Sequence, residues 1–176
     1  MTALNLAAKR NNTDIVDLLF AHPDILFEPN EFSGYKKLTK VTIKKKLKMI
    51  WFNSFKNCSS LTRIVFPPTL EEIQSSAFEG CISLANVTFP SSLLRIQNRV
   101  FYGCRSLTEI TIPSSLVSLG GLAFAGCTSL VKVTYEQNSS LKRVGYNIFE
   151  GCTLLKNKKI PLKNQKFSED IPPFFI

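Results

Sequence analysis

Five cysteines are the residues of this sequence best suited to chemistry, because a thiol can bind a metal, form a disulfide or act as a nucleophile. They are Cys58, Cys81, Cys104, Cys127 and Cys152, and their spacings are 23, 23, 23 and 25 residues. No Cys-x-x-Cys pair is present and the only histidine is His22, so we expect no metal site. The chain also has no phosphate-binding loop and no nucleophile beside a base. We therefore predict a protein that is not an enzyme, with no catalytic residues and no cofactor.

Lysines are the second group that could do chemistry. The net charge is +9, and residues 32–60 carry eight lysines and no acid. A patch of this kind could bind an anionic surface, an acidic polysaccharide or nucleic acid. The candidate polyanion patch is Lys36, Lys37, Lys44, Lys45, Lys46 and Lys48. Nucleic acid is the least expected partner because few arginines and no aromatics are interleaved with these lysines. The alternative is a solvated face with no ligand.

The cysteine spacing is part of a repeat that the rest of the chain shares. A phenylalanine stands three residues before each cysteine, and a leucine stands three residues after it. A sixth copy begins upstream at Phe32, with Tyr35 in place of the cysteine. Fixed spacing of this size is typical of stacked repeats. We therefore expect six repeats over residues 32–161.

The local pattern of one repeat predicts its secondary structure. Phe78-Glu-Gly-Cys81 has helical-turn spacing, and Gly80 can end that turn. Apolar and polar residues then alternate from Leu84 to Phe89, which favours a short strand. A single repeat buries too little apolar surface to fold alone, so neighbouring repeats must stack. The prediction is a right-handed α/β repeat solenoid whose short strands form a parallel sheet on one face.

Stacking also decides what the cysteines do. Equivalent residues of adjacent repeats lie roughly 4.8 Å apart with parallel Cβ directions. A disulfide needs Cβ atoms about 3.8 Å apart that point toward each other. We therefore predict a buried ladder of free thiols that act as small apolar side chains.

The exposed side of the predicted sheet is the candidate partner-binding surface. Residues that alternate with the buried ones form two columns there. One column is mostly charged and the other is mostly threonine. The strand propensity of threonine is enough to explain the second column. The ten candidate partner-binding residues are Lys40, Thr42, Arg63, Val65, Asn86, Thr88, Glu109, Thr111, Lys132 and Thr134.

The repeat pattern Phe-x-Gly-Cys-x-x-Leu-x-x-Val-x-Phe-Pro-x-x-Leu resembles the BspA-type leucine-rich repeat. This resemblance implies a leucine-rich-repeat superhelix that binds proteins and, in several family members, adheres to host or bacterial surfaces. We predict a non-enzymatic protein–protein interaction module that uses the strand face. One alternative is a surface-adhesion or polyanion-binding module that uses the lysine patch. Another is a fragment of a larger protein with no independent function.

Residues 1–31 resemble one ankyrin repeat. Thr2 to Ala8 opens a helical face, and a second helix would follow Thr13 with Val16 and Leu18 on its apolar side. We expect this helix pair to cover the N-terminal edge of the solenoid. We expect the tail of residues 162–176, which ends in an apolar hexapeptide, to cover the other edge.

The cellular location is predicted from two features. No apolar run approaches the roughly 18 residues of a membrane span, and the N-terminus has no basic leader. Together with free cysteines, these features predict a cytoplasmic protein. The family resemblance instead implies association with a cell surface.

Overall fold

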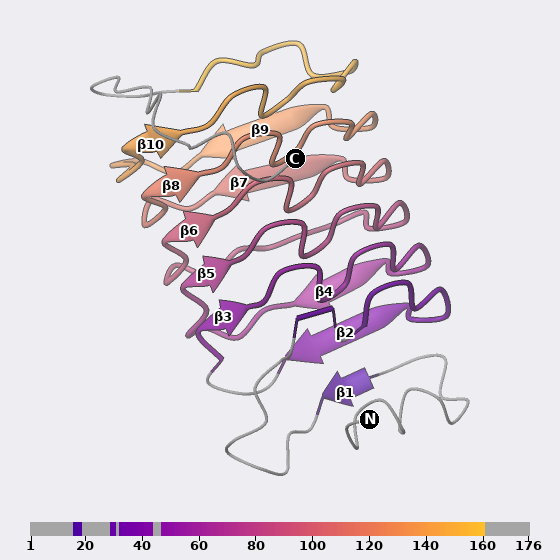
Figure 1. The fold of residues 1–176 in the computed structure, drawn as a ribbon. Helices are drawn as coiled ribbons and strands as arrows, with labels where there is room; N and C mark the ends of the chain where they lie inside the picture. Colours follow the sequence, from indigo (N-terminus) through magenta and orange to yellow (C-terminus); the bar gives the residue numbers. More distant parts are fainter. Residues whose placement is uncertain (1–15, 19–28, 31, 44–46, 161–176) are drawn as a thin grey trace.

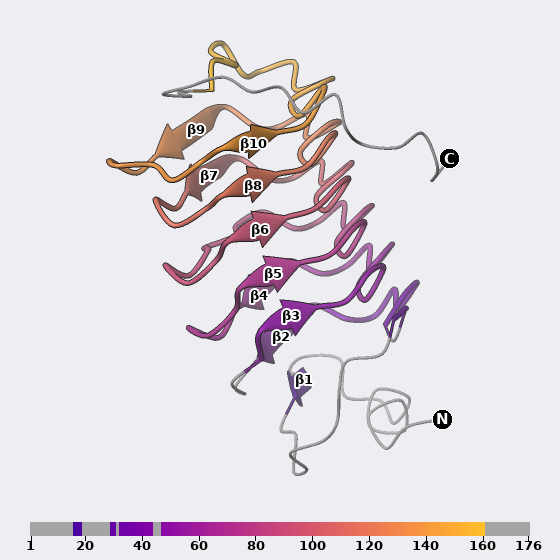
Figure 2. The ribbon, with the colours of Figure 1, turned by 60° about the vertical axis from the view of Figure 1, so that its left-hand side comes forward.

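The chain winds into a stack of similar coils (Figures 1 and 2). The computed structural model describes residues 16–18, 29–30, 32–43 and 47–160. A typical coil runs along one face as a strand, turns, crosses a second face as a shorter strand and closes through a turn that carries a phenylalanine. In Figure 2 the shorter strands cross the front from left to right while the chain climbs, so the winding is right-handed, as predicted.

The first face carries parallel strands, all of them predicted except the first. They are β1 (Val16–Leu18), β2 (Lys40–Ile43), β4 (Arg63–Val65), β7 (Glu109–Ile112) and β9 (Lys132–Tyr135). β1, β2 and β4 pair in parallel, and so do β7 and β9. Between β4 and β7 the ladder continues only through isolated bridges at Asn86. The coil that carries Asn86, the third one counted from the coil of β2, therefore joins β4 to β7 without a regular strand of its own on this face.

The second face carries a sheet that was not predicted. Its strands are β3 (Met49–Ile50), β5 (Glu72–Ile73), β6 (Arg95–Ile96), β8 (Ser118–Leu119) and β10 (Arg143–Val144). All five pair in parallel, in the order β10-β8-β6-β5-β3. Two residues are too few to show an alternating pattern in the sequence. The strands form because buried backbone groups must find partners, and the next coil supplies them.

The predicted helical component is absent from the described residues, which contain no helix. The turns between the two sheets are single turns, such as the one in which Cys81 N donates to Phe78 O (3.2 Å). Left-handed backbone at Ser76 (φ 57°) and Gly80 (φ 72°) stops each turn from extending into a helix. The N–H groups of Phe78 and Gly80 instead donate to carbonyls of the next coil. The α part of the α/β prediction is therefore not confirmed in the described residues.

A continuous file of phenylalanine rings occupies the centre of the stack. Successive ring centroids lie 5.2 to 5.9 Å apart, and the rings are close to parallel. The rings belong to Phe32, Phe55, Phe78, Phe101, Phe124 and Phe149, all of which are buried. Each ring therefore depends on the coils above and below it for its burial.

The five cysteines form the predicted ladder of buried, free thiols. These thiols fill space as small side chains, and they also form hydrogen bonds. Each Sγ donates a hydrogen bond to the phenylalanine carbonyl of the preceding coil, as Cys104 does to Phe78 O at 3.2 Å. The same bond recurs at the other four cysteines with distances of 3.0 to 3.2 Å. Burial raises the pKa of Cys58 to about 12, so this thiol stays protonated at neutral pH.

The N-terminal edge of the first face is covered by a strand and not by the predicted second ankyrin-like helix. β1 pairs with β2, with Val16 opposite Val41 and Leu18 opposite Ile43. An open strand edge exposes backbone donors and acceptors that another strand can satisfy and a helix cannot. The first predicted helix, at 2–8, and the predicted cap at 162–176 lie outside the described residues. Within the described part of the chain, no helix is long and apolar enough to cross a membrane.

Candidate functional site

The charged column of the first face stacks in register from coil to coil. Lys40 lies opposite Arg63, and Arg63 is bridged to Asn86. Asn86 is bridged in turn to Glu109, and Glu109 lies opposite Lys132. All five side chains are exposed. The structure therefore brings together five of the ten predicted partner-binding residues in one line.

The threonine-rich column runs beside it. Thr42 lies opposite Val65 in the lower half of the ladder, and Thr111 lies opposite Thr134 in the upper half. Thr88 belongs to the third coil and is exposed. Only Thr42 is half-buried in this column. The remaining five candidate residues thus share the face, while their role in binding stays a prediction.

Charged side chains on the second sheet pair with one another between coils. Lys48 Nζ lies 2.9 Å from Glu71 Oε1, and Arg95 Nε lies 2.7 Å from Glu72 Oε2. Glu72 is buried and also accepts a hydrogen bond from Gln97 Nε2. These pairs link neighbouring coils.

Ion pairs between neighbouring coils also occur at the phenylalanine-bearing turns, where Glu79 pairs with two cations. Its carboxylate lies 3.3 Å from Lys56 Nζ and 3.2 Å from Arg99 Nε. Partial burial acts to raise the pKa of Glu79, but hydrogen bonds from Arg99 and Ser76 and the two cationic charges outweigh it and lower that pKa. The guanidinium of Arg99 also stacks 4.0 Å from the centre of the Tyr102 ring.

The charged column of the first face differs from both of these regions. In the described part of the chain, none of its five side chains takes part in the ion pairs or side-chain hydrogen bonds that link coils elsewhere. Strand propensity does not account for lysine, arginine and glutamate at these positions. These side chains are therefore free to pair with groups of another molecule.

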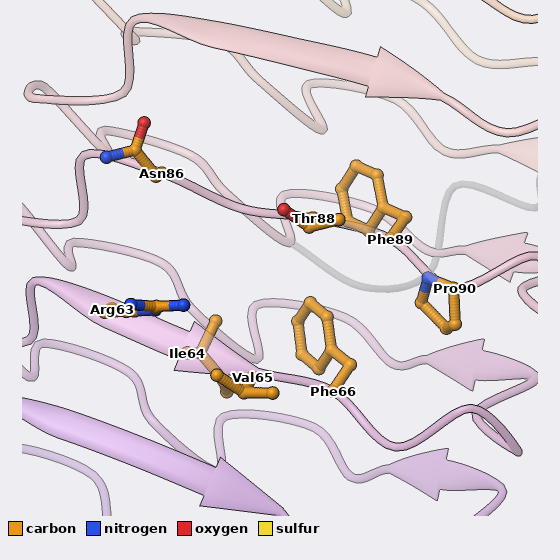
Figure 3. Close-up of a pocket in the computed structure, with 8 residues that line it drawn as sticks. All are labelled: Arg63, Ile64, Val65, Phe66, Asn86, Thr88, Phe89 and Pro90. Atoms are coloured by element: carbon orange, nitrogen blue, oxygen red, sulfur yellow. The ribbon is translucent and has the colours of Figure 1, made fainter.

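A groove of about 660 Å³ opens on this face between β4 and the third coil (Figure 3). Arg63 and Asn86 lie at one end, and Phe66, Phe89 and Pro90 lie at the other. The groove coincides with the interruption of the ladder, where only Asn86 bridges the flanking strands. Phe66, Phe89 and Pro90 were not predicted as site residues. The third coil has the same alternation as its neighbours, so the sequence carries no signal of the interruption.

The predicted polyanion patch is only partly described. Lys36 and Lys37 are exposed and precede β2, whereas Lys48 precedes β3 and pairs with Glu71. β2 separates these two groups along the coil. Residues 44–46 lie outside the described part, so the patch as a binding site stays a prediction.

Metal binding finds no support in the described residues. Among them, no group of three or more histidine, cysteine, aspartate or glutamate side chains could hold a metal ion.

The stacked parallel ladders define a leucine-rich-repeat solenoid. The chain belongs to the BspA-type leucine-rich repeat family, whose repeat matches residues 26–156 in six copies. This family and fold are typically non-enzymatic and are consistent with an interaction or adhesion module. No curated protein matches the sequence. The ankyrin resemblance receives no support.

Solved structures of bacterial leucine-rich repeat proteins are similar to this chain. A leucine-rich repeat protein of T. pallidum is 29% identical, with a TM-score of 0.59 over 72% of this chain and 69% of that one. One from Bacteroides ovatus is 30% identical, with a TM-score of 0.65 over 73% and 33%. A leucine-rich cell surface protein of Faecalibacterium prausnitzii is 25% identical, with a TM-score of 0.64 over 81% and 45%. The match thus spans less than half of the latter two proteins.

Proposed function

We propose that this chain is a non-enzymatic protein-interaction module that binds a protein partner through the first face of the solenoid. The observation that carries this proposal is the in-register column of Lys40, Arg63, Asn86, Glu109 and Lys132. Several charged groups elsewhere on the described surface, such as Lys48, Lys56 and Arg95, pair with acids of a neighbouring coil, whereas these five do not. A partner with complementary charges would gain ion pairs without breaking any within the chain.

The size of the face sets the strength of the interaction. Six strand positions at roughly 4.8 Å spacing and four to five residues of length give about 400 Å². A stable protein interface needs about 800 Å² on each partner. The described coils alone should therefore bind weakly. Tight binding requires contacts from the edges of the face, a second copy of the chain or further repeats.

Two cellular locations for such binding are supported. The ladder of free thiols supports a reducing compartment. The similarity to a protein described as a cell surface protein supports an adhesive role outside the cell. The strand face would serve as the contact surface in either place.

The proposal is tested by capture with charge-reversed variants. The wild-type protein and the double variant Arg63→Glu/Lys132→Glu are immobilised and exposed to an extract of the native cells, and bound proteins are quantified by mass spectrometry. We expect the specific partner to be captured roughly ten-fold less by the variant, because repulsive contacts replace attractive ones.

The matched control is Arg105→Glu/Lys142→Glu, which changes the net charge equally at exposed positions outside the two columns. The control should capture the partner as the wild type does. Equal loss in both variants would show a non-specific charge effect and contradict the proposal. Loss on Lys36→Glu/Lys37→Glu alone would instead favour the polyanion patch.

A further inference from the structure

A second cavity, of about 470 Å³, opens on the second sheet across β6, β8 and β10. Arg95 and Arg143 lie on either side of Ser118 in its lining. Figure 2 shows these three strands side by side at the front of the molecule. The cavity is separate from the strand face discussed above.

The strand register explains why the two arginines meet there. Arg95 pairs with Ser118 across one strand spacing, and Arg143 pairs with Ser118 across the next. The two arginine backbones are therefore roughly 10 Å apart with their side chains on the same face. The short serine side chain between the two long ones leaves a gap, and both arginines line it.

Glycines bring the coils close together beside this gap. Gln97 in the lower coil is followed in register by Gly120 and Gly145, both of which line the cavity. A Cβ on Gly120 would lie 2.4 Å from the carbonyl carbon of Gln97. The backbones of neighbouring coils therefore approach too closely there for a side chain.

The polar groups that line the cavity are mainly hydrogen-bond donors. Arg95 uses Nε to bind Glu72, which leaves its terminal nitrogens available. No hydrogen bond or ion pair within the described residues engages the Arg143 guanidinium or the Ser118 hydroxyl. Asn98 accepts a bond from Gly121 N through Oδ1 and keeps its amide N–H groups free. No carboxylate lines the cavity.

We propose that this cavity binds a phosphate group, held between the guanidinium groups of Arg95 and Arg143 with Ser118 donating a further hydrogen bond. Two planar forks match the oxygens of a tetrahedral dianion, and charge-assisted bonds of this kind are about twice as strong as neutral ones. Glu72, on the neighbouring strand β5, holds Arg95 through its Nε. The phosphate would come either from a phosphorylated side chain of a partner or from free phosphate.

The test is a titration of the ¹⁵N-labelled full chain, followed by the amide resonances in NMR spectra. Inorganic phosphate and a blocked phosphoserine peptide are added in separate series, with sodium chloride at matched ionic strength as the reference. We expect saturable shifts centred on Ser118, Leu119 and Gly120. Tighter binding of the peptide identifies a phosphorylated side chain as the source, and tighter binding of phosphate identifies the free anion.

Variants separate this site from general attraction to a basic protein. Arg143→Gln should weaken binding roughly ten-fold, and Ser118→Ala about three-fold. Lys142→Gln removes the same charge from the neighbouring exposed residue and should change affinity less than two-fold. Shifts that match those with chloride, that persist in Arg143→Gln or that centre on Lys36 and Lys37 would overturn the proposal. The same spectra show whether each variant is folded.

Discussion

At the scale of single residues, the corner after each short strand of the second sheet requires a left-handed backbone. Five residues adopt it after these strands, with φ between 50° and 57°, namely Asn53, Ser76, Arg99, Leu122 and Asn147, and Asn30 has φ 64° one repeat before Asn53. Asparagine tolerates this conformation, whereas leucine pays about 1–2 kcal/mol for it. These positions are equivalent in the repeat but hold different residue types. The requirement for a left-handed backbone is therefore visible only in the structure.

Leu122→Asn should therefore stabilise the protein by about 1 kcal/mol, because the strain of the leucine backbone is relieved. Urea denaturation of the two proteins measures this difference. The reverse change, Asn53→Leu, should lose at least as much, since it also removes the bond from Asn53 Nδ2 to Asn30 Oδ1. A Leu122→Asn variant less stable than the wild type would show that packing of the leucine outweighs its strain.

The thiol ladder makes stability depend on pH. Burial raises the pKa of Cys58 from 9.0 to about 12, and burial raises the pKa of the other four cysteines as well. Above pH 9 the unfolded chain loses these protons and the folded chain keeps them, so the free energy of unfolding falls as pH rises. Cys58 alone should cost about 1.4 kcal/mol for each pH unit above 9.

Urea denaturation at several values of pH from neutral to strongly alkaline measures this loss. Cys58→Ala is the matched variant, because it removes one titrating group and keeps every tyrosine and lysine. Its stability should fall less steeply with pH than that of the wild type. Identical slopes for the two proteins would contradict the buried, protonated state of this thiol.

At the scale of elements, the distance between coils is set by backbone contacts as well as by side chains. A Cβ on Gly120 would lie 2.4 Å from Gln97 C, and one on Gly145 would lie 2.2 Å from Gly121 N. Both glycines follow short strands of the second sheet, where adjacent coils approach most closely. Gly103 is a different case, since it has φ 70° but nothing within 4 Å of the added atom.

Gly120→Ala and Gly103→Ala separate these two reasons for glycine. Gly103→Ala should lower the free energy of unfolding by about 1–2 kcal/mol, because alanine is strained in the left-handed conformation. Gly120→Ala should cost more, about 3 kcal/mol, because the backbone of the neighbouring coil must move. Thermal unfolding of both variants compares the costs. A smaller loss for Gly120→Ala would show that the coils can separate easily at this corner.

At the scale of the whole molecule, each coil is stable only in contact with its neighbours. Phe101 stacks on Phe78 at 5.4 Å below and on Phe124 at 5.3 Å above. Among the described residues, Phe149 stacks on one phenylalanine ring, that of Phe124, at 5.9 Å. In such a one-dimensional array the central interfaces couple the two halves, whereas an end interface affects its own coil most.

Phe101→Ala should therefore destabilise the whole chain by about 3–5 kcal/mol, since it opens a cavity at two interfaces. Phe149→Ala should reduce protection mainly in the last described coils. Amide hydrogen exchange, read residue by residue, distinguishes global from local opening. Equal, chain-wide loss of protection in both variants would contradict nearest-neighbour stacking.

The repeated columns of phenylalanine, cysteine and leucine were sufficient to predict the coil, its stacking, the parallel first face and the buried free thiols. They were sufficient because a residue type that recurs at a fixed spacing is explained by coils that stack with equivalent residues above one another. The exposed positions on the first face followed from the same register, since alternation along a strand decides which side chains face outward. The role of these residues in binding does not follow from register alone.

Other features were decided only by the tertiary structure. The second sheet, the thiol–carbonyl bonds and β1 in place of a helix all arise because backbone groups take partners from another coil. The opening beside Asn86 and the hollow over Gly120 depend on the spacing of neighbouring coils. A pattern read along one coil describes its own periodicity, whereas these features depend on how two coils meet in space.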